Sequence, residues 1–305
     1  MDLLDILTPL YLLIGFGYLL YRYQFPSLEF WPGIERMIYY VLFPTLIFVA
    51  LVKAPVDMSL LGLVLIIVLI PSLISGAIQA LGLLSPSVSG PTFTSMFQGA
   101  FRNNTAVSLV IAAWMLPENG LALMAVVLLI MIPMSNITSV TLLVRYGHSQ
   151  HLNPVSGIKS LMKNPLVLAC IFGLIFNVLG LTLPRSLTET AEFLGRSALP
   201  FSLLSVGAGL QFKSLLRKKL PILLSSITRL VVTPLLCWLL CYLLNVEADL
   251  AKVAIIFCAI PTAVSSYILA KQLGGDSEAM AQIITFQTLL AMITIPVFLY
   301  VAQSF

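Results

Sequence analysis

The chain has 305 residues, of which 59% are hydrophobic and only 9% are charged, and its formal net charge is +4. A soluble domain carries about 25% charged residues, so this composition excludes a soluble globular protein and predicts an integral membrane protein. No basic tract with interleaved aromatic residues occurs, which argues against nucleic acid as a partner.

Ten long apolar runs follow one another along the chain, and each is long enough to predict a membrane-spanning helix. They are apolar on all sides and lack the two-residue alternation of barrel strands, so an all-α fold is expected. The chain begins Met-Asp-Leu-Leu-Asp, which is acidic rather than basic, and this favours a retained first span over a cleaved signal peptide. The predicted spans are residues 3–21, 34–52, 59–82, 91–116, 120–145, 164–182, 196–212, 220–244, 251–271 and 277–302.

The basic residues predict the direction of these spans, because cytoplasmic loops are enriched in Lys and Arg. With the N-terminus outside, ten basic residues fall on the inner side, namely Arg22, Arg36, Arg145, Lys159, Lys163, Lys213, Arg217, Lys218, Lys219 and Lys271. Four fall on the outer side, namely Lys53, Arg185, Arg196 and Lys252. The sequence therefore predicts a multi-pass protein of the plasma (inner) membrane with both termini outside.

Short matches between the two halves predict an internal repeat. Thr-Ala-Val-Ser occurs at 105–108 in the fourth span and again at 262–265 in the ninth. Pro44 in the second span corresponds to Pro200 in the seventh, and residues 128–132 in the fifth resemble residues 289–293 in the tenth. Five spans per half reverse the direction of the second half. We therefore predict a 5+5 inverted repeat with halves 1–145 and 164–305 and a cytoplasmic linker, 146–163, a plan typical of secondary transporters.

The fourth and ninth spans are each interrupted near the middle, the fourth by a polar cluster that begins at Arg102 and the ninth by Pro261. A helix broken inside a membrane exposes backbone N–H groups that favour an anion. Breaks in corresponding spans of the two halves indicate a binding site. The predicted substrate-binding residues are Gln98, Arg102, Asn103, Asn104, Thr105, Pro261, Thr262, Ser265, Ser266 and Gln287, with Pro44, Ser108, Asn136, Pro200 and Arg229 as a second tier.

Two ionisable residues, Arg102 and Arg229, lie deep in predicted spans, and no Asp or Glu does. An Arg inside a membrane is costly and is usually functional or paired, and its planar fork matches a carboxylate. Arg102 is thus predicted to bind an anionic substrate or a helix C-terminus, whereas Arg229 either snorkels or bonds to broken backbone. Without a buried carboxylate as a proton site, H⁺ carried on the substrate, Na⁺ bound by neutral oxygens and passive transport all stay open. No cofactor or metal site is expected, because the four cysteines lie in apolar runs without metal-ligand spacing.

The stretches "FQGAFRNNTAVSLV", "IPTAVSSYILAKQLGGD" and "MAQIITFQTLLAMITIPV" resemble the auxin efflux carrier family of membrane transporters, in its prokaryotic branch. The resemblance covers essentially the whole chain. It implies a fold like that of the bile-acid sodium symporters, with helices 4 and 9 broken and crossing at a central site. It also implies that Asn104, Thr105 and Pro261 occupy family positions, although Asn103 stands where plant members have proline. Alternating access by spans 1, 2, 6 and 7 against the crossover bundle is likewise an implication of the family.

The predicted function is secondary transport of a small organic anion, a mono- or dicarboxylate such as malate or malonate. An anion channel is the main alternative, since helix N-termini and buried Arg suit anion selectivity. An intramembrane serine hydrolase using Ser108 or Ser265 is disfavoured because no base is placed to activate either residue, so no enzymatic activity is expected. The expected partners are the anion and the lipid bilayer, and the sequence leaves open a homodimer.

Overall fold

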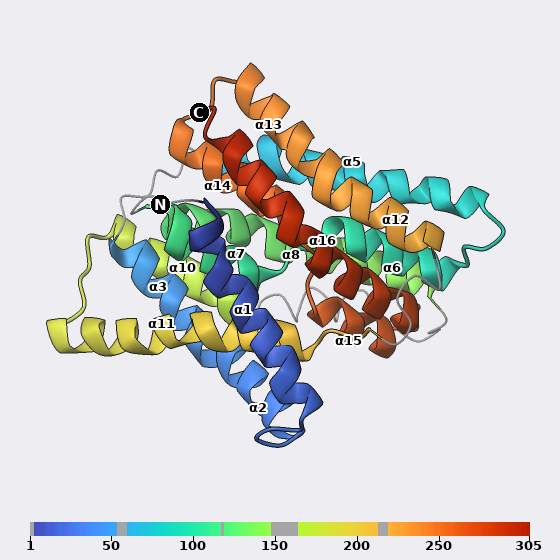
Figure 1. Cartoon of the computed structure of the whole chain (residues 1–305). Coiled ribbons are helices and arrows are strands. Elements are labelled where there is room, and N and C mark those ends of the chain that lie inside the picture. The colour runs from blue at the N-terminus through green and yellow to red at the C-terminus, as the bar shows by residue number, and fades with distance from the viewer. Residues whose placement is uncertain (1–2, 54–59, 117–118, 148–163, 213–218) are drawn as a thin grey trace. The chain divides into compact units, whose positions relative to one another are not determined.

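A computed structural model describes residues 3–53, 60–116, 119–147, 164–212 and 219–305, which form helices and no strand (Figure 1). By their internal contacts they fall into two compact units, each built from separated stretches of the chain. Unit 1 comprises Met1–Leu61, Ala106–Leu129 and Met162–Gly209, and unit 2 comprises Gly62–Thr105, Ile130–Leu161 and Leu210–Phe305. Each unit thus combines segments from both halves of the predicted repeat. Most of the predicted linker, 146–163, lies outside the described residues.

Unit 1 contains α1 (Leu3–Arg22), α2 (Phe30–Met37), η1 (Ile38–Leu42), α3 (Phe43–Lys53), most of α7 (Thr105–Met115), the first part of α8 (Gly120–Tyr146), α10 (Pro165–Val178) and α11 (Arg185–Ala208). Unit 2 contains most of α4 (Leu60–Val64), η2 (Leu65–Leu69), α5 (Ile70–Ile78), η3 (Gln79–Leu84), α6 (Gly90–Phe101), the rest of α8, α12 (Lys219–Ile227), η4 (Thr228–Val232), α13 (Thr233–Leu243), α14 (Ala248–Ala259), α15 (Ser265–Gln272) and α16 (Ser277–Ala302).

Each predicted span coincides with a helix or with a run of helices, and the fold is all-helical over the described residues as predicted. Among the described residues, five helical runs are long and apolar enough to cross a membrane: Phe30–Lys53, Leu60–Leu84, Gly120–Tyr146, Lys219–Leu243 and Ser277–Ala302. The largest boundary error concerns the seventh span, because α11 begins at Arg185 rather than at residue 196. Its first turns are polar but helical, supported by an Arg185–Glu189 pair with helical i,i+4 spacing.

Three short π-helical segments occur in these runs, and each ends two residues before a proline. η1 is followed by Pro44, η2 by Pro71 and η4 by Pro234. A proline inside a helix lacks the amide donor and its ring clashes with the carbonyl four residues earlier. Widening the preceding turn to i→i+5 hydrogen bonds relieves this clash without ending the helix. The three runs therefore stay continuous across their prolines.

Unit 1 is held together by close helix contacts at glycine. α1 packs against α11 and crosses it in the view of Figure 1, and a Cβ added at Gly17 would lie 2.0 Å from the carbonyl oxygen of Leu204. Likewise a Cβ at Gly207 of α11 would lie 1.9 Å from the carbonyl oxygen of Ile14 on α1. Small residues of this kind let helices approach closely in membranes, where no hydrophobic effect drives one helix onto another.

In unit 2, α6 is buried along its whole length from Pro91 to Phe101 and packs against α5, α12, α15 and α16. Its N-terminus is fixed by Asp276, the N-cap residue of α16. One carboxylate oxygen of Asp276 accepts from the α16 amide of Ala279 at 3.0 Å, and the other accepts from Thr92 Oγ1 at 2.8 Å. A single N-cap side chain thus joins the beginnings of α6 and α16.

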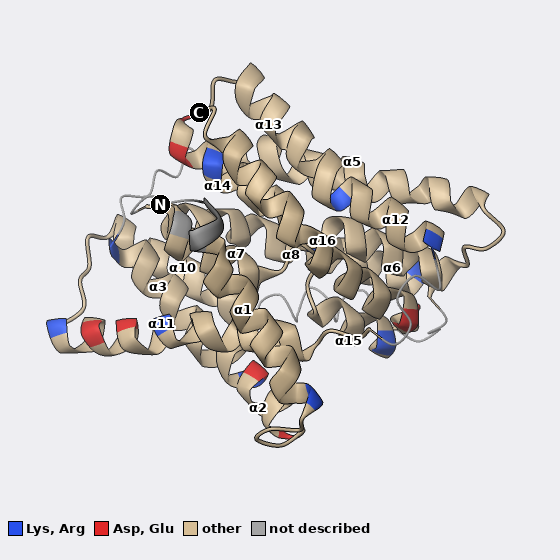
Figure 2. Cartoon of the chain, viewed as in Figure 1, with Lys and Arg blue, Asp and Glu red and all other residues tan. Residues whose placement is uncertain are grey.

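Charged residues are sparse, and those of the N-terminal half of α11 carry both signs (Figure 2). The second predicted span, 34–52, has an acidic residue near its start. Glu35 lies within the run Phe30–Lys53, is half-buried, and accepts a hydrogen bond from Ser205 Oγ on α11 at 2.8 Å. A half-buried acidic group is therefore present in unit 1.

Candidate functional site

The fourth predicted span is broken, although it contains no proline at the break. α6 ends at Phe101, Arg102 adopts an extended conformation with φ −78° and ψ 140°, and α7 begins at Thr105. Tertiary hydrogen bonds hold this interruption open. Asn103 Nδ2 donates to the carbonyl of Phe257 at 2.9 Å, and the amide of Asn104 donates to the carbonyl of Pro261 at 3.0 Å. The fourth span is therefore broken even though Asn103 replaces the family proline.

The ninth predicted span is broken at Pro261, as the sequence indicates. α14 ends at Ala259, Ile260 is extended with φ −77° and ψ 141°, and α15 begins at Ser265. A residue before proline is disfavoured in the helical region, which explains the conformation of Ile260. The residues that end α6 and α14, Arg102 and Ile260, thus have nearly the same backbone angles.

One buried side chain, that of Arg229, satisfies two carbonyl groups beside the second break. Arg229 of η4 is fully buried, and its Nε donates to the carbonyl of Ile260 at 2.7 Å while Nη2 donates to the carbonyl of Phe257 at 3.1 Å. Its charge therefore meets the negative end of the α14 dipole. Of the two roles that the sequence left open for Arg229, these contacts match binding to broken backbone.

Gln287 of α16 connects the two interrupted spans. Its Oε1 accepts from the amide of Thr262 at 3.0 Å, and its Nε2 donates to the carbonyl of Gly99 on α6 at 3.0 Å. Thr262 Oγ1 also donates to the carbonyl of Gln98 at 3.1 Å. Because both ends of the Gln287 amide bond to backbone in a fully buried place, this residue positions the breaks.

Arg102 is half-buried and bonds to two other predicted residues. Its Nη1 donates to Asn136 Oδ1 on α8 at 2.9 Å, and its Nη2 donates to Ser265 Oγ at 3.4 Å. Both of these partners are uncharged polar groups. The structure therefore brings together Arg102, Asn136 and Ser265, which come from three different helical segments.

The remaining predicted residues fall into two groups. Gln98 and Ser266 of unit 2 are fully buried, and both amide atoms of Gln98 and the hydroxyl of Ser266 lack a hydrogen-bond partner among the described residues. Thr105 begins α7. The other group belongs to unit 1, where Pro44 lies in α3, Pro200 in α11 and Ser108 in α7.

Sequence reasoning missed several residues that hold this arrangement. The carbonyls of Gly99, Phe257 and Ile260 are backbone acceptors, for which a sequence carries no signal. The sequence does contain a signal for Asp276, because a Gly-Gly-Asp turn before a helix indicates an N-cap residue. Gly274 in this turn has φ +74°, a conformation that glycine adopts without strain.

An apolar helical chain with interrupted helices whose broken ends hydrogen-bond to each other is the construction of a membrane transport protein. The chain belongs to the membrane transport protein family, which includes the auxin efflux carriers, and the family model matches residues 3–299. This match confirms the resemblance seen in the sequence and the membrane location.

Two curated relatives are consistent with this membership. An uncharacterized transporter of Methanothermobacter thermautotrophicus is 25% identical over 86% of each chain. A putative malonate transporter of Rhizobium meliloti is 22% identical and covers 99% of this chain and 97% of its own.

Proposed function

We propose that the protein is a secondary transporter that moves a small organic anion, a mono- or dicarboxylate such as malonate or malate, by alternating access. The observation that carries this proposal is the half-buried guanidinium of Arg102, which lies at a helix break and bonds to uncharged Asn136 and Ser265. A carboxylate matches the planar fork of Arg. The name of the Rhizobium meliloti relative, a putative malonate transporter, supports the same class of substrate.

We further propose that the chain is a 5+5 inverted repeat of ten spanning helices, with crossing at the two breaks. The matched backbone angles at the ends of α6 and α14 support this plan. So do the π-helical segments η2 and η4, which lie in the third and eighth predicted spans and precede Pro71 and Pro234 by the same spacing. Similar local distortions in corresponding spans are expected of duplicated halves.

The proposed mechanism assigns motion to the first, second, sixth and seventh predicted spans, which lie in unit 1 beside most of α7 and the first part of α8. The two breaks and their hydrogen bonds belong to unit 2, and these bonds keep the substrate-binding backbone in one arrangement while the four spans move. We place the protein in the plasma (inner) membrane with both termini outside, on the distribution of Lys and Arg. Five of the basic residues behind this orientation, Lys159, Lys163, Lys213, Arg217 and Lys218, lie outside the described residues.

Glu35 is a candidate proton carrier if transport is coupled to H⁺, because a half-buried carboxylate inside a helical run can carry a proton. Na⁺ bound by neutral oxygens remains the alternative. The atoms of Gln98 and Ser266 that lack partners among the described residues are polar groups that water, substrate or a cation can satisfy.

The test is uptake into proteoliposomes of malate, malonate, succinate, lactate and indole-acetate, each with and without inward H⁺ and Na⁺ gradients. We expect saturable uptake of one carboxylate that is stimulated by the same anion on the opposite side. Uptake without saturation or exchange stimulation would indicate an anion channel instead. A serine hydrolase is not supported, since Ser265 accepts from Arg102, which cannot act as a base.

Arg102→Gln is the decisive variant, with Arg185→Gln as its control because Arg185 is exposed and pairs only with Glu189 in this structure. We expect the first to lose most anion uptake at normal folded yield and the second to transport normally. Normal uptake by Arg102→Gln would contradict the proposed site.

A further inference from the structure

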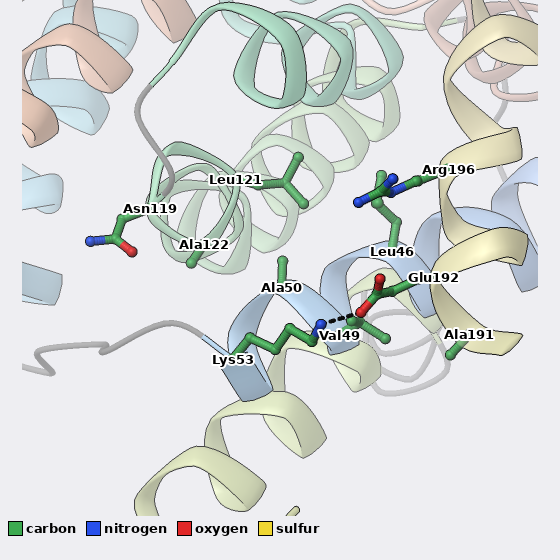
Figure 3. Close-up of a pocket in the computed structure, with 10 residues that line it drawn as sticks. All are labelled: Leu46, Val49, Ala50, Lys53, Asn119, Leu121, Ala122, Ala191, Glu192 and Arg196. Atoms are coloured by element: carbon green, nitrogen blue, oxygen red, sulfur yellow. Dashed lines mark hydrogen bonds and ion pairs between the residues drawn. The ribbon is translucent and has the colours of Figure 1, made fainter. Parts of the chain in front are cut away.

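Unit 1 contains a pocket of about 340 Å³ that shares no residue with the cluster around Arg102 (Figure 3). Three segments contribute to it: α3 from Leu46 to Lys53, the beginning of α8 with the residue before it, and the middle of α11. The lining residues are Leu46, Val49, Ala50, Lys53, Asn119, Leu121, Ala122, Ala191, Glu192 and Arg196. Its volume is in the range of sites for small molecules.

The charges of the pocket are unequal. Lys53 from α3 and Arg196 from α11 supply two positive charges, and Glu192 supplies one negative charge. Lys53 Nζ forms an ion pair with Glu192 Oε1, drawn as a dashed line in Figure 3. Arg196 forms no ion pair with a carboxylate in the described parts of the chain. One positive charge therefore remains for a ligand.

Glu192 is ionised and accessible in this pocket. The hydrogen bond from Lys53 holds the pKa of Glu192 below its ordinary value, and the charges of Lys53 and Arg196 add to this effect. The side chains of Lys53 and Glu192 are 54% and 28% exposed, so water reaches the ion pair. An exposed pair of this kind adds little to stability, so another carboxylate can replace Glu192 at Lys53.

The rest of the lining defines the ligand further. Leu46, Val49 and Leu121 provide apolar surface beside the charged side chains, and Asn119 adds an amide. In Figure 3, Lys53 extends from α3 toward Glu192, and Arg196 points from α11 into the space beside Leu46 and Leu121. Two cations beside apolar side chains suit a small carboxylate with a short hydrocarbon part better than a strongly hydrated inorganic anion.

We propose that this pocket is a second anion site, in which a small carboxylate binds Arg196 and displaces Glu192 from Lys53. The choice of ligand class rests on the proposed transport function. When no ligand is bound, Glu192 forms the ion pair with Lys53 and so competes with the carboxylate of the ligand. Filling the pocket raises the local concentration of the transported anion near this end of unit 1, as a charged cleft does for its substrate.

The test introduces a reporter thiol by Ala191→Cys, because Ala191 lines the pocket and the four native cysteines are buried. Its reaction with a small thiosulfonate is followed in detergent with malonate or with choline chloride of equal ionic strength. Ser186→Cys is the matched control, since Ser186 is exposed on the same helix outside the pocket. We expect malonate to slow labelling of Ala191→Cys several-fold and to leave Ser186→Cys unchanged.

Two further substitutions on the Ala191→Cys background give opposite predictions. Arg196→Gln removes the protection, whereas Glu192→Gln lowers the malonate concentration needed for half protection several-fold. Equal labelling rates with and without malonate, or protection unaffected by Arg196→Gln, would overturn the proposal.

Adding Arg102→Gln separates this site from the proposed transport site. Protection must persist in that variant, and its loss would show that malonate acts through the cluster around Arg102. Because labelling needs no transport, a failed uptake assay with intact protection contradicts only the proposed function.

Discussion

Gln287 makes the clearest energetic prediction, because its side-chain amide serves two backbone groups that have no other described partner. Gln287→Leu keeps a similar volume but leaves the amide of Thr262 and the carbonyl of Gly99 without these hydrogen bonds. Both spans are buried here, so water does not replace the lost amide.

The expected loss of unfolding free energy can be worked out from the two backbone groups that lose a hydrogen bond. Leaving one buried donor or acceptor unsatisfied costs about 1–3 kcal/mol, whereas interhelical hydrogen bonds in a membrane average about 0.6 kcal/mol. For two groups these figures bracket a loss of about 1–6 kcal/mol. In a chain of this size each kcal/mol lowers the melting temperature by about 2–4 °C, so a fall of several degrees is expected.

The melting temperature is measured in detergent with a thiol-reactive fluorophore. The four cysteines are buried, so they react only when the protein unfolds. Gln272→Leu is the control, because Gln272 is an exposed glutamine at the end of α15. Uptake by Gln287→Leu should also fall, as the two breaks lose their common anchor. A variant with wild-type melting temperature and uptake would refute the positioning role.

Three other substitutions test the packing and the breaks. Gly17→Ala should destabilise unit 1 by about 1–3 kcal/mol, because its Cβ would meet the Leu204 carbonyl, whereas Gly15→Ala has nothing within 4 Å and should melt like wild type. Arg229→Met should lower the melting temperature, with Arg229→Lys restoring part of it, because two carbonyls lose their donors; equal melting of all three proteins would contradict this role. Pro261→Ala should lower the uptake rate by letting α14 extend past its break, and full activity would count against a break fixed by proline.

Much of the helix pattern could be predicted, because a membrane imposes a length and an apolar composition on each span. The fourth and ninth spans also revealed their interruptions, one through a polar cluster at mid-span and the other through Pro261. The start of α11 at Arg185 could not be read from hydropathy, since its first turns are polar and are helical through local pairs.

The contacts within the site were beyond sequence reasoning for a physical reason. Arg229 left two interpretations open because nothing in the sequence says which carbonyls lie near it. Gln287 is a predicted substrate-binding residue, but its two bonds to backbone groups could not be read from the sequence. In both cases the partner is a backbone atom released by a distant helix break, and such atoms have no residue type that a pattern could detect.

The two helix breaks have nearly the same backbone geometry but different causes. This difference matters for recognising the two halves as a repeat. At Ile260 the extended conformation follows from the covalent structure of Pro261. At Arg102 nearly the same angles occur without a proline, and the hydrogen bonds of Asn103 and Asn104 to the ninth span accompany them. The second break can therefore form from local sequence, while the first depends on the second being in place. Comparing residue types alone therefore underestimates the similarity of the two halves. What the two breaks share is a backbone conformation, and different side chains produce it.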